Sequence, residues 1–251
     1  AAAGTATFSA VQFDAAGTYT IIASSGSLTT VTSSNVVVTL VPSVILAWQL
    51  NGNTGDEATV NATTNNTNLN TSTLSRGSGL NVSGLANAYG STNYTSSGNK
   101  ANAIANNKFQ TFTIQAKPGY KVSLSTLDVR FRRSGTGPNA FRWQYSTDGT
   151  NFTDIGSADI SYTGTTTGGD PQTQIDLSGI STLQNVTNAT TITIRLLGWG
   201  ASATTGTFAI GRSLTNGATD YSLSIGGFID VDNTPLLGIT GPTNHGSSCP
   251  T

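Results

Sequence analysis

The amino-acid sequence predicts an all-β protein whose main part is a two-sheet sandwich, and three observations lead to this fold class. Strand-like alternation of apolar and polar residues recurs along the chain, whereas helical periodicity is hard to find. Charged residues make up 9% of the chain, against about 25% in ordinary soluble domains. Thr, Ser, Asn and Gly take their place, and β-branched Thr suits a half-exposed pleated surface. Roughly ten strand-like runs lie within residues 44–232, a number that favours a jelly-roll-like sandwich.

Residues 1–43 contain three strand-like runs, which are too few to cover both faces of a sandwich. The runs are Ala6 to Phe13, Thr18 to Ala23 and Ser34 to Leu40. This segment either docks on its own sandwich, belongs to a domain whose first half has been cut away, or is completed by a neighbouring subunit. We favour the last, because unpaired strand edges and apolar side chains invite pairing with another chain. The expected interface consists of the apolar residues of these runs: Phe8, Val11, Phe13, Tyr19, Ile21, Val36 and Val38.

Residues 44–232 form the expected main domain, and residues 233–251 are an extended tail. Alternation is clearest between positions 44 and 50, 109 and 116, 127 and 132, and 141 and 145, while residues 51–107 have the composition of long loops with short strands. Asp148-Gly149 is a tight-turn signal after the fourth of these runs. The positions expected in the core are Trp48, Phe131, Phe141, Trp143, Tyr145, Ile194 and Leu196.

Two groups of motifs carry a resemblance to known families. The phrase Phe13-Asp-Ala-Ala-Gly-Thr-Tyr-Thr-Ile-Ile resembles the corner and following strand of bacterial immunoglobulin-like domains. The phrases Ile45-Leu-Ala-Trp-Gln-Leu-Asn-Gly, Tyr145-Ser-Thr-Asp-Gly-Thr-Asn-Phe-Thr and Arg195-Leu-Leu-Gly-Trp-Gly resemble a galactose-binding-like or discoidin-like sandwich. Such sandwiches occur in large secreted cell-surface proteins of Bacteroidota-like bacteria, which are type IX secretion cargo. The resemblance implies an extracellular location at a bacterial cell surface, but it assigns no catalytic or binding residue.

Composition argues against several classes of function. The formal net charge is -1, so the surface as a whole does not favour nucleic acid. The longest apolar run, Val44 to Trp48, is far shorter than the roughly 18 residues of a membrane span. The single histidine, His245, and the single cysteine, Cys249, both lie in the tail, where a catalytic base or a zinc site would lack a rigid frame. We therefore expect a protein that is not an enzyme and has no catalytic cofactor.

Three weak candidate sites remain. Trp199 lies between two glycines just after a strand and could stack on a sugar at the rim of the sandwich, although a core position is the ordinary alternative. Arg130, Arg132, Arg133 and Arg142 form a basic run within thirteen positions. Arg130, Arg132 and Arg142 are expected to point away from the aromatic face of adjacent strands, where they would bind a carboxylate or sulfate or else pair with Asp128.

The third candidate is a structural calcium site, and the chain offers two clusters for it, of which Asp56 and Glu57 with nearby Asn53 are one. Asp230, Asp232 and Asn233 offer the oxygen ligands that calcium prefers, and a solvated polar edge is the alternative.

The sequence leaves two functions open. The first is a non-enzymatic structural or adhesive surface protein, a filament subunit that associates with copies of itself through β-strand contacts. The alternative is a carbohydrate-binding module of a larger secreted protein, with surface glycans as its partners.

Overall fold

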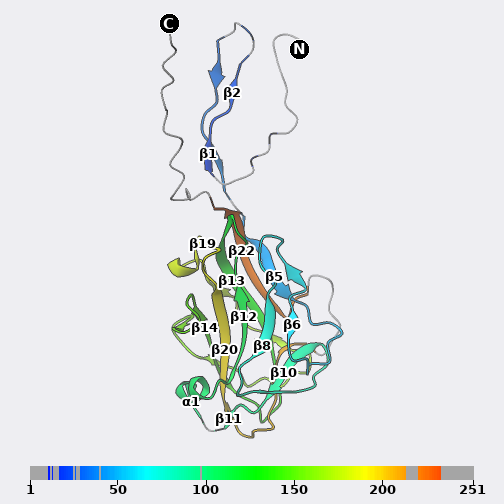
Figure 1. Ribbon diagram of the computed structural model, residues 1–251. Helices are drawn as coiled ribbons and strands as arrows, with labels where there is room; N and C mark the ends of the chain where they lie inside the picture. The colour runs from blue at the N-terminus through cyan, green and yellow to red at the C-terminus, as the bar shows by residue number, and fades with distance from the viewer. Residues whose placement is uncertain are drawn as a thin grey trace, which may run out of the picture.

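The computed structural model describes residues 11, 13, 17–24, 26, 29–39, 41–96, 98–212 and 220–232, and its fold is all-β (Figure 1). Two large sheets face each other, and a short two-stranded ribbon extends from one end of the body they form. This confirms the predicted fold class of a two-sheet sandwich.

The first sheet contains ten strands among the described residues, and its central path runs β7-β5-β22-β13-β21-β10-β9. Three further short strands, β17, β18 and β19, pair along β13. The bounds are β5 Ser43–Trp48, β7 Thr64–Asn65, β9 Asn81–Val82, β10 Ala88–Thr92, β13 Tyr120–Arg133, β17 Asp170–Pro171, β18 Ile175–Asp176, β19 Val186–Thr187, β21 Phe208–Gly211 and β22 Leu223–Val231.

The second sheet contains eight strands in the described part of the chain, and its path runs β15-β14-β20-β12-β8-β6, with β11 beside β20 and β16 beside β14. The bounds are β6 Val60–Asn61, β8 Thr73–Arg76, β11 Thr95–Ser96, β12 Phe109–Ile114, β14 Ala140–Ser146, β15 Thr153–Asp154, β16 Ile160–Ser161 and β20 Ile192–Ala201. Neighbouring strands are antiparallel in both sheets, except that β11 runs parallel to β20. Successive strands repeatedly cross from one sheet to the other, as they do in jelly-roll sandwiches.

The hydrophobic core lies between the two sheets. Trp48 of β5 packs on Phe112 of β12, with ring centroids 5.0 Å apart. Phe131 of β13 packs on Phe141 of β14 at 4.9 Å. Of the side chains expected in the core, six are at most 2% exposed: Trp48, Phe131, Phe141, Trp143, Ile194 and Leu196. The seventh, Tyr145, is half-buried, and its hydroxyl accepts a hydrogen bond from the Thr182 side chain at the surface.

Strand β13 keeps one face toward the core only because it contains a β-bulge. Val122 and Leu124 are buried at even positions, whereas Leu127, Val129 and Phe131 are buried at odd positions. The pairing with β22 shifts by one residue between Leu124 and Thr126. An extra residue in one strand reverses the alternation that follows it. The bulge therefore allows one long strand to supply core residues along its whole length.

A short helix covers part of the outer face of the second sheet. This helix, α1 (Lys100–Ala105), is capped at its N-terminus by Asn99, whose side chain accepts a hydrogen bond from the backbone N–H of Asn102. Ala103 is buried against Leu197 and Trp199 of β20. From the sequence, this region is expected to contain long loops and short strands. The helix is not predicted because its six residues are too few to produce a clear helical period. The remaining short helix among described residues is the 3₁₀ turn Ser181–Leu183.

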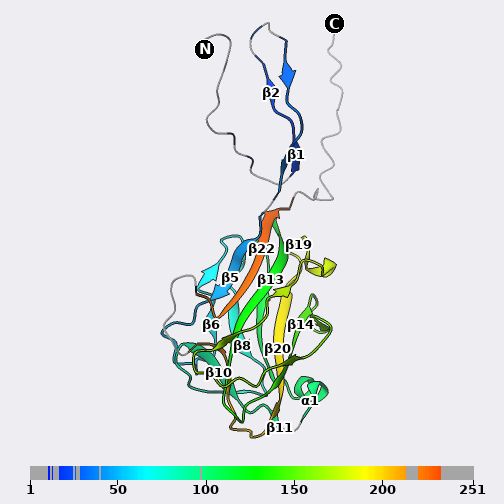
Figure 2. The ribbon, with the colours of Figure 1, turned by 180° about the vertical axis from the view of Figure 1, so that it is seen from behind.

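The N-terminal ribbon stands clear of the sandwich in both Figure 1 and Figure 2. Its strands are β1 Gly17–Tyr19, β2 Ile22–Ala23, β3 Val31–Thr32 and β4 Val36–Val38. Strand β1 pairs with β4, and β2 pairs with β3. The ribbon leads directly into β5, which is part of the first sheet. The predicted run from Ala6 to Phe13 lies almost entirely outside the described residues, as does the tail 233–251.

Candidate functional site

Trp199 does not form the exposed stacking platform expected from the sequence. Its side chain is 7% exposed and packs with Leu197 and Ala103 beneath helix α1. The two flanking glycines suggested exposure, but the outer face of β20 is covered by the helix that the sequence did not reveal. Of the two alternatives that the sequence left open for Trp199, the structure supports the buried one, and the exposed stacking position is wrong.

The structure also separates the predicted arginine cluster. Arg130 and Arg132 lie on β13 in the first sheet, whereas Arg142 lies on β14 in the second sheet. Arg142 is 6% exposed and forms an ion pair with Asp159, its NH2 group lying 2.6 Å from the Oδ1 atom. The expectation that these three side chains form one cluster is wrong. The chain passes from the first sheet to the second between β13 and β14, so the two strands are not neighbours in one sheet.

The expected partner of that cluster, Asp128, is occupied elsewhere. Its carboxylate accepts hydrogen bonds from the Gln174 side chain at 2.9 and 3.1 Å. The second alternative of the sequence analysis, an arginine face paired with Asp128, has no ion pair to support it among the described residues.

The candidate calcium ligands that the structure describes, Asp230 and Asp232, lie at the end of β22, which is next to the base of the ribbon in Figure 1. Asp230 faces Lys121 across the pairing of β22 with β13, and its carboxylate accepts a hydrogen bond from the N–H of Val231. The backbone N–H of Asp232 donates to the carbonyl of Gly119. Asn233 lies outside the described residues. Within the described ranges, no three His, Cys, Asp or Glu side chains gather as a metal site would require, and the calcium site stays a prediction.

The expected interface residues lie on the ribbon where the structure describes them. Tyr19, Val36 and Val38 are half-buried on one face of the β1–β4 pair, and the Phe13 ring packs on the Tyr19 ring at 4.8 Å. Val11 and Ile21 are 55% and 42% exposed. Phe8 lies outside the described residues, as do His245 and Cys249.

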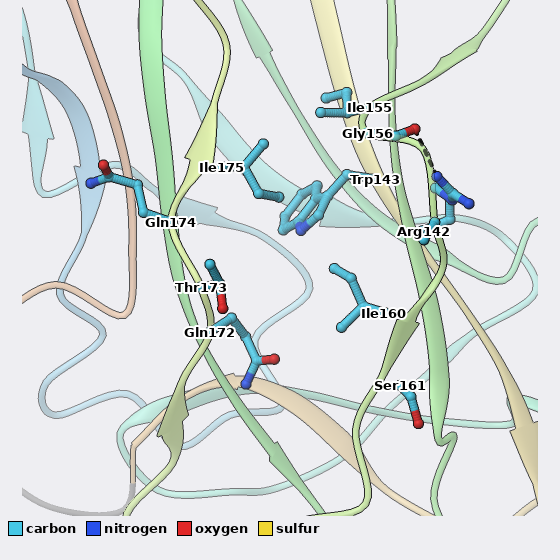
Figure 3. Close-up of a pocket in the computed structure, with 11 residues that line it drawn as sticks. Arg142, Trp143, Ile155, Gly156, Ile160, Ser161, Gln172, Thr173, Gln174 and Ile175 are labelled. Carbon is cyan, nitrogen blue, oxygen red and sulfur yellow. Dashed lines mark hydrogen bonds between the residues drawn. The ribbon is translucent and has the colours of Figure 1, made fainter.

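A slot opens between the two sheets at the edge where β14 meets its short neighbours (Figure 3). Its volume is about 310 Å³, which is the lower end of the range for small-molecule sites. One wall comes from the segment 155–161 after β15, and the other comes from residues 172–175 before and within β18. The lining combines isoleucines with amide and hydroxyl groups: Ile155, Ile160, Ile175, Gln172, Thr173, Gln174 and Ser161.

Trp143 contributes the most unusual group to this slot. Its side chain is 1% exposed, yet the indole Nε1–H has no hydrogen-bond partner among the described residues. In Figure 3 the indole extends toward Ile175, and its nitrogen is on the side of Thr173 and Ile160. A buried donor without an acceptor costs about 1–3 kcal/mol. The slot therefore has one buried donor without a partner in its wall, next to isoleucines and to the amide and hydroxyl groups of the lining.

Arg142 closes one side of the slot through a network on the outer face of the second sheet. Its NH1 group donates to the Gly156 carbonyl at 2.9 Å (Figure 3). Beside it, Asp154 accepts from Gln144 at 2.6 Å and pairs with Lys100 of helix α1. Because Asp154 interacts with Lys100, Gln144 and Arg142, the pKa of its carboxyl lies below the ordinary value despite the opposing effect of burial. This network holds the loop that forms the slot wall.

A second hollow, of about 280 Å³, lies at the far end of β13. It is lined by Arg132 and Arg133 together with threonines of the loop 165–167. From the sequence, Arg133 is counted in the same basic run as Arg130, Arg132 and Arg142, but it is not chosen as a candidate binding residue. The sequence does contain a signal that Arg133 is unusual. Leu127, Val129 and Phe131 alternate toward the core, and position 133 continues this pattern. A charged residue at a core-facing position is rare and indicates a special role. The walls of both hollows come from loops, whose courses carry no periodic signal.

The described residues include no helix that is both long and apolar enough to cross a membrane. No protein-family model matches the chain, and no curated protein matches it in sequence.

Proposed function

We propose that this chain is a non-enzymatic structural subunit of an extracellular assembly at a bacterial cell surface, joined to its neighbours through the N-terminal ribbon. The observation that carries the proposal is the ribbon itself. It stands clear of the sandwich in Figures 1 and 2, and each of its strands has a single partner strand among the described residues.

The exposed side chains of the ribbon support an association surface. Ile22, Val31 and Val37 are 65%, 65% and 67% exposed. An isolated two-stranded ribbon is marginally stable in water. Added strands would bury these side chains and give the open edges main-chain hydrogen-bond partners. The ribbon therefore has more to gain from a partner than any other described element.

A filament follows from the position of the ribbon. If the ribbon of one subunit completes a different surface of the next, the contact is heterologous and does not close on itself. Repetition of such a contact gives an open filament. The secreted, cell-surface setting rests on the resemblance of the sequence motifs to surface proteins, and localisation of the chain by immuno-electron microscopy would test it.

The assembly proposal predicts that residues 1–41 are needed for association. Their deletion leaves Ser43, where β5 begins, in place. The full chain should form concentration-dependent assemblies in sedimentation velocity and fibres in electron micrographs, and the shortened chain should be monomeric. Val37→Lys should weaken association at least about tenfold, since burial of one valine contributes roughly 1.5–3 kcal/mol.

Val82→Lys is the matched control, because Val82 is 51% exposed on β9 of the sandwich. It should assemble like the unmodified chain. A full chain that stays monomeric at high concentration would overturn the proposal, and so would a shortened chain that assembles equally well.

The carbohydrate-binding alternative is retained because of one observation, the slot with the unpaired Trp143 donor. Sugar hydroxyls can accept from an indole N–H, and the amides of Gln172 and Gln174 can bind further hydroxyls. Titration with neutral mono- and disaccharides should shift the indole N–H resonance of Trp143, whereas that of Trp48, which donates to the Val60 carbonyl, should stay unchanged. No shift at millimolar sugar would count against this function.

A further inference from the structure

Two neighbouring arginines line the hollow at the end of β13 without a carboxylate beside them. Among the described residues, the ion pairs involve Lys100, Arg142 and Arg212, and none involves Arg132 or Arg133. The acid on the adjoining segment, Asp170, accepts hydrogen bonds from the hydroxyls of Tyr162 and Thr166. Among the described residues, the two arginines that line the hollow therefore form no ion pair, and the Asp170 carboxylate next to them is hydrogen-bonded to Thr166 of the lining.

Backbone carbonyls fix the guanidinium of Arg133. NH1 donates to the carbonyl of Thr163 at 3.0 Å, and NH2 donates to the carbonyls of Gly135 and Gly137 at 3.0 and 2.8 Å. The side chain is 9% exposed, and its Nε–H has no partner in the described part of the molecule. A guanidinium has five N–H donors, so three bonds leave two of them unused.

Half-buried Arg76 shows what an arginine with a structural role looks like in the same protein. Its Nε donates to Gly90 and Ser91, NH1 to Glu57 and Ala58, and NH2 to Gly55 and Gly90. Every nitrogen of Arg76 therefore has a partner. By contrast, among the described residues Arg132 forms one long side-chain hydrogen bond, 3.4 Å, to the carbonyl of Ala86. Arg132 and Arg133 therefore leave some of their N–H donors without a partner among the described residues, whereas every nitrogen of Arg76 has one.

Burial of a cation without a counter-charge is unfavourable. Desolvation by burial lowers the pKa of both Arg132 and Arg133. A bound anion would remove this cost, and the planar fork of a guanidinium matches a carboxylate or sulfate group with two parallel hydrogen bonds. The hollow, at about 280 Å³, is larger than a bare inorganic ion requires, and Thr165 and Thr167 belong to its lining.

We propose that this hollow is a binding site for an acidic sugar residue, whose carboxylate or sulfate group contacts Arg132 and Arg133 while its hydroxyls contact the threonine loop 165–167. The site is independent of the assembly proposed above. Strand β13 begins at the ribbon end of the sandwich and ends at this hollow, so the two lie roughly 40 Å apart at about 3.3 Å per residue. The hollow is therefore remote from the ribbon of its own subunit.

Calorimetric titration of the full chain tests this proposal, with glucuronate as the carboxylate probe, galactose 6-sulfate as the sulfate probe, and glucose as the neutral control. We expect one or both acidic sugars to bind and glucose not to bind. Arg132→Gln should weaken binding about tenfold or more, since a charge-assisted hydrogen bond contributes roughly 1.5–3 kcal/mol. Arg130→Gln, which removes the same charge two residues earlier on β13, is the matched control and should change affinity less than about twofold.

Arg133→Lys provides a second test, because it keeps the positive charge but loses the planar fork. Its thermal unfolding shows whether the fold is intact, and a folded variant should bind at least about tenfold more weakly. Equal losses in Arg132→Gln and Arg130→Gln would overturn the site, as would an unmodified chain that binds no acidic sugar. If inorganic sulfate or an acidic peptide binds as tightly as the acidic sugars, the assigned ligand class is wrong.

Discussion

At the scale of single residues, the sandwich depends on a few buried polar groups whose partners are backbone atoms. The Tyr89 ring is fully buried, with the Arg76 guanidinium carbon 3.6 Å from its centroid. The Tyr89 hydroxyl donates to the Ala58 carbonyl at 2.8 Å. Together these contacts attach the loop around residues 55–58 to strand β10. The sequence does not identify the partners of Arg76, because nearly all of them are backbone carbonyls of the loop 55–58 and of Gly90, and any residue carries such a group.

Tyr89 makes the stability of the fold sensitive to alkaline pH. Burial raises the pKa of its hydroxyl to about 12, and the nearby Arg76 charge opposes this only in part. The unfolded chain ionises near the ordinary value of about 10. The stabilisation is therefore complete below pH 10 and is lost as the pH rises from 10 to 12, because only the unfolded state can release the proton. A difference of about two pKa units corresponds to at most about 2.7 kcal/mol.

Urea unfolding at pH 9, 10 and 11 checks this dependence. The unfolding free energy should fall between pH 10 and 11, and Tyr89→Phe should show a smaller fall, although it loses about 1 kcal/mol at pH 9 with the hydroxyl hydrogen bond. Burial also raises the pKa of Tyr94 and Tyr162, so some alkaline sensitivity should persist in the variant. An identical alkaline fall in both proteins would exclude Tyr89 as a cause.

At the scale of elements, the sequence predicts long strands well and irregular features poorly. The predicted run from 109 to 116 becomes β12, and the aromatic alternation at 141, 143 and 145 becomes β14. The Asp148-Gly149 turn is also present, with Gly149 at a φ of 74° and Asp148 accepting from the N–H groups of Thr150 and Asn151. Such features are local, and so the chain itself carries their signal.

Elements that depend on distant packing left no such signal. Helix α1 is stabilised by the outer face of β20, and the bulge in β13 is visible only once β22 is aligned beside it. The arginine pattern misled for the same reason. Arg132 and Arg142 are ten residues apart, but whether the strands that carry them are neighbours is decided by which sheet each strand joins. The slot and the hollow likewise form between loops from different sheets.

At the scale of the whole molecule, the ribbon and the sandwich make separate contributions. The continuous core runs from Ile45 to Ile225 and contains no residue of the ribbon. Deletion of residues 1–41 should therefore leave the unfolding free energy of the monomeric sandwich unchanged within about 1 kcal/mol. For a domain of this size, that corresponds to a melting temperature within about 2–4 °C.

The dependence of the melting temperature on protein concentration should distinguish association through the ribbon from packing within the sandwich. If subunits associate through the ribbon, the melting temperature of the full chain rises with protein concentration, because association stabilises the folded state by mass action. The shortened chain should melt at one temperature across the same hundredfold range of concentration. Calorimetry of both chains measures this directly. A shortened chain that melts well below the dilute full chain would mean that the ribbon stabilises its own sandwich, which would contradict the separation of the two parts.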